Sequence, residues 1–129
     1  MSGNIPSELK YTNDHEWAKI EGDNAIIGIT DFAQNALGDI VFVELPEVGS
    51  TLDKGATFGV VESIKSVSDL YAPLSGEVVE VNNELESTPE LINSAAYDSW
   101  IVKIKLSNAS ETSELLDADK YQEICDSES

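Results

Sequence analysis

Residues 57–71 read TFGVVESIKSVSDLY, and this stretch decides the fold that the sequence predicts. The runs 57–61 and 67–71 are rich in β-branched and aromatic residues, which is typical of strands. The connection 62–66 is short enough for a hairpin, so it places Lys65 at the tip. Pro73 ends the second run, because proline cannot donate to a strand ladder. The stretch therefore predicts an antiparallel hairpin that exposes one lysine.

Lys65 has the position expected of a carrier lysine. Such a lysine has to project into solvent, where a modifying enzyme can reach its amine. It also needs a rigid turn that the enzyme can recognise by shape, and flanking strands that hold an arm away from the protein surface. Position alone leaves the alternative open, since any exposed lysine of an acidic protein would look the same.

The segment upstream of the hairpin predicts a second hairpin and a short helix. Two strand-like runs within 16–29 flank the residues EGDN at 21–24, which tolerate the positive φ of a tight turn. Thr30 or Asp31 can cap a helix, because either side-chain oxygen can accept a free first-turn N–H. Gly38 is a natural end for that helix.

Strand patterns also surround the hairpin more widely. The segments 40–45, 76–81 and 100–106 are expected to be strands, and 83–93 to form one or two short helical turns with Pro89 in a first turn. Asp117 can cap a final helix over 118–125, with Tyr121, Ile124 and Cys125 on one face.

A weak internal repeat relates two of these strands. GDIVFV at 38–43 and GEVVEV at 76–81 share the pattern of glycine, acid, two strand formers, any residue and valine. The repeat favours two small sheets folded against each other with approximate two-fold symmetry. Chance similarity between two strands is the alternative.

The chain length of 129 residues indicates a single domain, 1–129, with 1–9 and 126–129 expected to fray. Its longest apolar run falls well short of the ~20 residues that cross a bilayer. The first residues lack the features of a signal or transit peptide. We therefore expect a cytoplasmic protein, or a mitochondrial matrix protein if this is a processed form.

The charge is strongly negative. The chain has 25 acidic and 7 basic residues, a formal net charge of −18, and every basic residue is lysine. This charge disfavours nucleic acid and anionic membranes and favours basic patches on protein partners. Cys125 is the single cysteine, so it cannot form an internal disulfide. We expect a reducing compartment and an inert, packed thiol.

A series of motifs runs along the chain in a fixed order: YT at 11–12, HEW at 15–17, GITD at 28–31, AQ at 33–34, LGD at 37–39, VFVELP at 41–46, VESIK at 61–65, AP at 72–73, SGEV at 75–78, VN at 81–82, PELIN at 89–93, and Trp100. In this order and spacing they strongly resemble the H protein of the glycine cleavage system, a lipoyl carrier family. The resemblance runs from about residue 10 to residue 105, and more loosely through the C-terminal helix. Each motif is short, but their joint order is highly specific.

The resemblance implies an all-β fold with short helices, namely a lipoyl-type barrel-sandwich hybrid of two small antiparallel sheets with flanking helices and a C-terminal helix. It implies that Lys65 carries lipoate in amide linkage and that Glu62, three residues earlier, is the recognition mark for lipoylation. Biotin carriers typically have methionine on both sides of the lysine. Ile64 and Ser66 stand there in this chain, which disfavours a biotinyl carrier.

The resemblance also implies a non-catalytic carrier subunit. It would take the aminomethyl group of glycine from a pyridoxal-phosphate glycine decarboxylase to a tetrahydrofolate-dependent aminomethyltransferase, and then visit dihydrolipoamide dehydrogenase. A lipoate ligase, or a lipoyl or octanoyl transferase, would load Lys65. The alternatives are a lipoyl relay that donates lipoate to other carriers, a biotinyl carrier, and a stand-alone enzyme with His15 as base.

Two acids match family positions that hold the loaded arm: Glu16 and Asp69. Carboxylates in a cleft would pair the ammonium of the aminomethyl group and slow attack by water. Asp14 stands where relatives can have serine, so its role stays open. The alternative for Glu16 and Asp69 is that each is a solvated acid at a strand edge.

His15 is the only histidine, and we interpret it as structural or as a partner contact. No nucleophile motif accompanies it. The sequence also has no glycine-rich phosphate loop and no Cys/His cluster suited to zinc, so it predicts neither catalytic residues nor a metal site. Trp17 and Trp100 are expected in the core or in a cleft wall.

Overall fold

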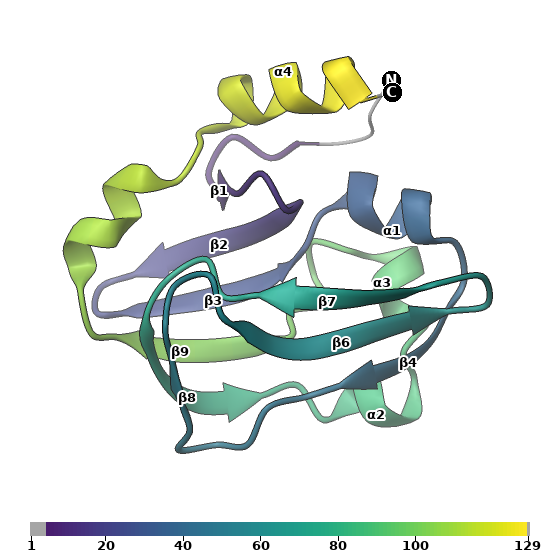
Figure 1. The fold of residues 1–129 in the computed structure, drawn as a ribbon, viewed down its shortest axis with the longest axis horizontal. Helices are drawn as coiled ribbons and strands as arrows, with labels where there is room; N and C mark the ends of the chain where they lie inside the picture. The colour runs from purple at the N-terminus through teal and green to yellow at the C-terminus, as the bar shows by residue number, and fades with distance from the viewer. Residues whose placement is uncertain (1–4, 129) are drawn as a thin grey trace.

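The computed structural model describes residues 5–128. Its strands form two antiparallel sheets packed against each other, and the C-terminal helix lies over the N-terminal segment at the top of Figure 1. This confirms the predicted fold class. The two sheets remain separate layers and do not close into a barrel among the described residues.

The larger sheet has six strands in the order β1-β2-β3-β9-β8-β5. Their bounds are β1 Lys10–Tyr11, β2 Glu16–Glu21, β3 Asn24–Ile29, β5 Thr51–Leu52, β8 Gly76–Val81 and β9 Val102–Leu106. The smaller sheet has the order β4-β6-β7, with β4 Ile40–Glu44, β6 Thr57–Ser63 and β7 Val67–Tyr71. The larger sheet includes the β2–β3 hairpin, because β3 pairs with β9.

The local signals around the first hairpin are confirmed. Strands β2 and β3 meet at a tight turn in which Gly22 has φ of 62°. Of the two candidate caps it is Thr30 that caps α1 (Asp31–Leu37), since its hydroxyl accepts the N–H of Ala33 at 3.2 Å. Gly38 ends the helix with φ of 84°. That left-handed conformation favours glycine.

The two strands of the internal repeat lie in different sheets, as β4 and β8. Each contains a register irregularity of the β-bulge kind, between Ile40 and Phe42 in one and between Val78 and Glu80 in the other. These positions are equivalent under the repeat, and a bulge bends and twists a strand. The shared bulge supports a genuine repeat over chance similarity.

The core has two parts. The main cluster lies between the sheets and includes Ile27, Val43, Val61, Leu74 and Ile104, each almost completely buried. The second cluster lies under the C-terminal helix α4 (Ala118–Glu128). Its buried members are Leu9, Tyr11, Trp17, Tyr121 and Cys125.

The second cluster confirms the expected burial of Trp17 and Cys125, while Trp100 is partly buried against it. The rings of Tyr11 and Tyr121 stack with centroids 4.7 Å apart, so α4 is attached through aromatic packing. Within the described residues no helix is long and apolar enough to span a membrane.

The segment 83–93 forms two short helices, α2 (Glu84–Ser87) and α3 (Leu91–Ser94), which is one of the two predicted alternatives. The expectation for Pro89 needs correction, because it precedes the N-cap of α3 instead of lying in a first turn. Helix α4 also continues past the predicted end at residue 125 to Glu128, whose carboxylate binds His15. At the other end Leu9 is buried. The predicted frayed residues 1–4 and 129 lie outside the described residues.

Candidate functional site

Lys65 lies at the tip of the β6–β7 hairpin, as predicted, and its side chain is exposed. Ser63 fixes the turn. Its backbone N–H donates to the carbonyl of Ser66 at 2.8 Å, and its hydroxyl oxygen accepts the N–H groups of Lys65 at 3.3 Å and Ser66 at 3.1 Å. The N–H of Ile64 donates to the carbonyl of Asp39 at 3.0 Å, which ties the tip to the start of β4. The lysine therefore projects from a rigid turn.

The stem of Lys65 lies over Gly38 at the end of α1. A Cβ atom placed on Gly38 would be 3.3 Å from Cε of Lys65, closer than ordinary van der Waals contact. None of the ion pairs between described residues involves Lys65, so its amine is held by no carboxylate there. The amine is thus available for chemistry.

Glu62 lies on the outer face of the three-stranded sheet, between Phe42 and Val67 in the cross-strand register. The neighbouring side chains are 46% and 65% exposed, unusually open for apolar residues. The predicted recognition carboxylate is therefore presented next to Lys65 within an apolar surface that another protein can contact.

Glu16 is only 2% exposed, although it stands at the first position of β2. One carboxylate oxygen accepts the N–H of Tyr71 at 2.8 Å, and the other accepts the hydroxyl of Thr12 at 3.4 Å. The Tyr71 bond joins β2 to the edge strand β7 and so bridges the two sheets. Burial, with a smaller effect of the nearby Asp14 carboxylate, raises the pKa of Glu16 to about 8, although the two hydrogen bonds act to lower it.

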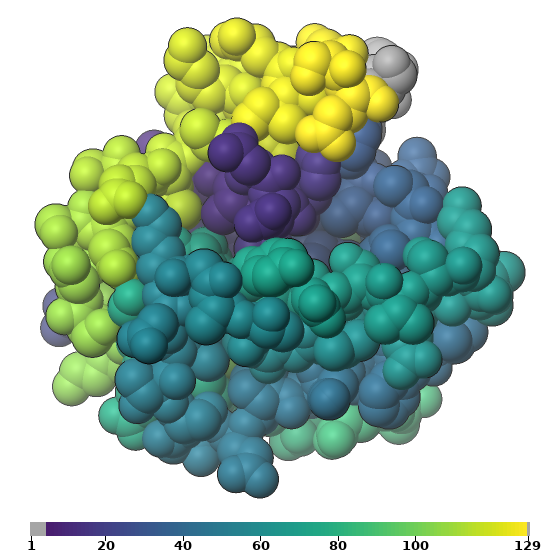
Figure 2. Space-filling model, viewed as in Figure 1, coloured from purple at the N-terminus to yellow at the C-terminus, as the bar shows by residue number. Residues whose placement is uncertain are grey.

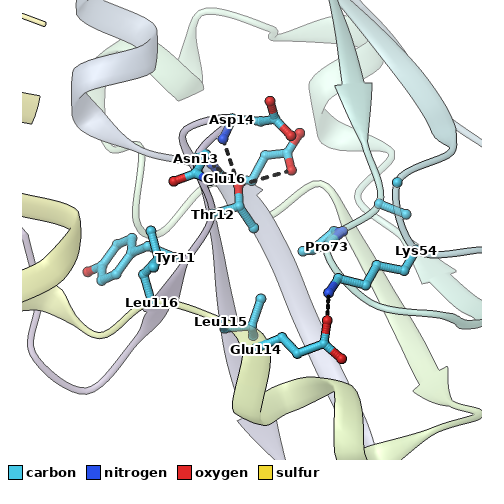
Figure 3. A pocket seen from close by; sticks show the side chains of 12 residues that line it. Tyr11, Thr12, Asn13, Asp14, Glu16, Lys54, Pro73, Glu114, Leu115 and Leu116 are labelled. Atoms are coloured by element: carbon cyan, nitrogen blue, oxygen red, sulfur yellow. Dashed lines mark hydrogen bonds and ion pairs between the residues drawn. The ribbon is translucent and has the colours of Figure 1, made fainter. Parts of the chain in front are cut away.

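Glu16 borders a pocket of about 190 Å³ (Figure 3). Asp14 and Glu16 form one side of this pocket, which we call the acidic wall. Thr12 organises this wall, because the Thr12 hydroxyl oxygen also accepts the N–H of Asp14 at 3.2 Å. Figure 3 shows the Asp14 and Glu16 carboxyl groups on the same side of this turn. On the opposite wall the ammonium of Lys54 is paired with Glu114. The acidic wall is therefore the part left open to an incoming cation.

A second pocket, of about 210 Å³, adjoins the first at Asp14, which lines both. It is lined by Asp14, His15, Phe32, Ala33, Ala36, Leu37, Ser68 and Glu128. We call it the arm groove. Figure 2 shows a recess in this region, between α1 with the N-terminal segment and the strands of the smaller sheet. The arm groove includes Leu37, which precedes Gly38 under the stem of Lys65, and Asp14, which also lines the first pocket.

Asp69 has a different environment from Glu16. It is exposed on β7, opposite Val60 in the register, and it lines neither pocket. Its neighbour Ser68 does line the arm groove. The structure therefore places Glu16 in the first pocket, next to the arm groove that shares Asp14 with it, and leaves Asp69 outside both.

His15 uses both ring nitrogens in contacts with α4. Nδ1 lies 2.8 Å from the hydroxyl of Tyr121, and Nε2 lies 3.0 Å from a carboxylate oxygen of Glu128. This agrees with the structural role predicted for it.

Sequence reasoning missed Glu128 in the arm groove and Lys54 in the first pocket, because no local pattern links either one to Glu16. No group of three metal-binding side chains occurs in the part of the chain that the structure describes.

The sequence and the fold are both similar to those of known proteins. The model of the family described as glycine cleavage H-protein matches residues 9–128. A glycine cleavage system H protein of Staphylococcus epidermidis is 59% identical over 121 residues, covering 93% of this chain and 96% of the relative. One of Halalkalibacterium halodurans is 56% identical, covering 97% and 98%. The crystal structure of one from Mycobacterium marinum aligns with a TM-score of 0.85 at 44% identity, covering 92% and 97%.

Proposed function

Because the chain belongs to the glycine cleavage H-protein family, we propose that it carries lipoate on Lys65 and shuttles the aminomethyl group of glycine between the enzymes of that system. The observation that carries this proposal is the placement of Lys65 on a rigid, exposed turn, with an amine that no carboxylate holds in the described structure. It acts as a carrier subunit and leaves the chemistry to its partners.

The residues around Lys65 fit a lipoyl arm. The amine provides the nitrogen of the amide link, and Glu62 offers the ligase or transferase a carboxylate on the same hairpin. Half of the residues that line the arm groove are apolar residues of α1, which suit an aliphatic chain. When attached, the lipoyl group would supply a disulfide that is reduced as one sulfur takes up the aminomethyl group, and that is restored when the remaining dithiol is oxidised.

Glu16 is assigned to shield the loaded arm, meaning the lipoyl arm with its aminomethyl group. At pH 7 its carboxyl group is mainly protonated, since its pKa is raised to about 8. An ammonium beside it favours the ionised form, so the arrival of the cation releases a proton and creates the ion pair in place. The burial of Glu16 also keeps water away from its carboxyl group. Asp69 is assigned to the outer rim, beside Ser68 on β7.

The partners proposed are the glycine decarboxylase, the aminomethyltransferase and dihydrolipoamide dehydrogenase, together with the enzyme that attaches lipoate. The net charge of −18 supports contact with basic surfaces on them. The relatives compared are bacterial, which supports a cytoplasmic location.

The decisive experiment measures the intact mass of the protein after incubation with lipoate, ATP and a lipoate ligase. We expect one lipoyl increment that peptide mapping assigns to Lys65 and that is lost in Lys65→Arg. Lys54→Arg is the matched control, because Lys54 is also a turn lysine but is paired with Glu114. An unmodified wild-type protein under conditions that modify an authentic lipoyl domain would refute the proposal.

A further inference from the structure

The turn that carries the acidic wall depends on an unusual residue. His15 has φ of 65°, and it is the only non-glycine residue with positive φ in the described part of the chain. Histidine adopts this conformation more readily than bulky residues do, but it still needs support from its surroundings. That support comes from outside the turn: Tyr121 and Glu128 bind the two ring nitrogens, and the ring of Phe32 stacks on the imidazole with centroids 4.6 Å apart.

The hydrogen bonds of this cluster can be assigned from the available donors. The Thr30 oxygen already accepts the N–H of Ala33 and lies 2.6 Å from the Tyr121 hydroxyl. With a neutral imidazole, Nε2–H donates to Glu128, Nδ1 accepts from Tyr121, and Tyr121 accepts from Thr30. With a charged imidazole, Nδ1–H donates to Tyr121 and Tyr121 donates to Thr30.

The bonds of His15 to Tyr121 and Glu128 can form in either charge state of the imidazole. Burial raises the pKa of Tyr121 well above its usual range, which keeps the phenol protonated as the arrangement requires. We call these contacts of His15 with Tyr121 and Glu128 the clamp.

The clamp is linked to the arm groove through the residues on either side of His15. His15 lies between Asp14, which lines both pockets, and Glu16, which lines the first pocket. The carbonyl of His15 also accepts the N–H of Thr30 at 3.0 Å, which fixes the turn against the start of α1. Glu128 forms part of the groove wall as well. The last turn of α4 thus reaches the site from 113 residues away in sequence.

We propose that Glu128 and Tyr121 are positioning residues that hold the acidic turn of residues 12–16 closed over the arm groove, so that retention of the loaded arm depends on the end of the C-terminal helix. This inference rests on the proposed function for its consequence, but the closed turn itself can be measured without lipoate. Neither residue touches the reacting atoms; both act through His15.

The test compares full-length Glu128→Ala, Glu128→Gln and Tyr121→Phe proteins with the wild type. The glutamine carbonyl can still accept the Nε2–H of His15, and phenylalanine keeps the stacking on Tyr11 while losing the hydroxyl. Glu123→Ala is the matched control, because it removes the same charge from an exposed position of the same helix.

Two quantities are measured. The first is the titration midpoint of the Glu16 carboxyl, followed by carbon NMR on unmodified protein. The second is the lifetime of the loaded arm, followed as formaldehyde and ammonia released when water displaces the aminomethyl group from sulfur. We expect Glu128→Ala and Tyr121→Phe to lower the Glu16 midpoint from about 8 toward 4.5, because water would reach the Glu16 carboxyl group. The same variants should shorten the lifetime of the loaded arm about fivefold, which is the loss expected for one hydrogen bond. Glu128→Gln should retain both wild-type values.

The proposal is overturned if Glu128→Ala and Tyr121→Phe match Glu123→Ala in both quantities, or if Glu128→Gln behaves as Glu128→Ala does. Failure of lipoylation in the wild type would count against the carrier function instead. The Glu16 titration would still decide whether the clamp exists.

Discussion

At the scale of single residues, Glu16 shows how burial sets chemistry. Its carboxyl group is almost entirely removed from water and receives only two hydrogen bonds, one of them long at 3.4 Å. Burial penalises the charged form more than these bonds stabilise it, so the pKa rises to about 8. A buried acid that is neutral until a cation arrives is suited to receiving an ammonium.

The same shift predicts how stability depends on pH. The folded protein holds a proton on Glu16 between the unfolded value near 4.5 and about 8, whereas the unfolded chain has released it. Stability is therefore lost as the pH rises through this window, by at most about 1.4 kcal/mol per pH unit from this group.

Urea unfolding of the wild type and Glu16→Gln at several pH values between 5 and 9 measures this contribution as the difference between the two curves. Glutamine keeps an oxygen that can accept the Tyr71 N–H but does not titrate. We expect the variant to gain stability relative to the wild type as the pH rises. A constant difference across the range would show that Glu16 is ionised in the folded state throughout.

At the scale of elements, the hairpin that bears Lys65 depends on one hydroxyl. Ser63 is 9% exposed, and its oxygen accepts two N–H groups of the turn. Ser63→Ala removes that acceptor and should cost about 1–3 kcal/mol, the range expected for partly buried donors left without a partner. The looser tip should also slow lipoylation, because the modifying enzyme reads the shape of the turn.

Ser87→Ala is the control for this prediction, since the Ser87 hydroxyl makes one exposed hydrogen bond at the end of α2. Initial rates of lipoyl incorporation and urea midpoints are compared for both variants. Equal rates for Ser63→Ala and Ser87→Ala would mean that the enzyme does not require a fixed turn.

Elements whose signals are local were predicted well. The β2–β3 turn, the Thr30 cap of α1 and the β6–β7 hairpin each follow from a few adjacent residues. The end of α4 could not be found this way, because the last turn is held by a bond from Glu128 to His15. Whether residues 83–93 form one helix or two could not be decided from the local pattern, since both short helices are set by packing of Leu85 and Ile92 into the main core.

At the scale of the whole molecule, the net charge of −18 acts on association. This charge should attract partners with basic surfaces, and dissolved salt weakens such long-range attraction. The rates at which these partners associate with the protein should therefore fall as ionic strength rises. We expect the KM of the protein as a substrate of lipoate ligase to rise several-fold from about 0.05 M to about 0.5 M salt, with kcat little changed.

The control for this prediction is a short peptide spanning residues 57–71, which has a much smaller charge. If it serves as a substrate, its KM should respond less to salt than that of the whole protein. A KM of the whole protein that is independent of salt would show that charge does not guide this encounter.

The site as a whole could be predicted only in part. Lys65 and Glu62 belong to one local motif, and the structure places both on the same exposed hairpin. The burial of Glu16 depends on the docking of β7 against β2 through Tyr71, which no local pattern encodes. Asp69 and Glu16 stand in comparable sequence patterns, yet the packing of the two sheets buries one and exposes the other.

The complete burial of Cys125 has a consequence for redox chemistry. The strained cyclic disulfide of a lipoyl arm would react readily by thiol–disulfide exchange, and the thiol closest to it would be one on the same molecule. The only thiol of this chain is fully enclosed beneath α4, in the cluster with Tyr11 and Tyr121. An enclosed sulfur is not accessible to a tether on Lys65, so the proposed lipoyl arm would not cross-link to its own protein. Such an arm would exchange only with thiols of other molecules.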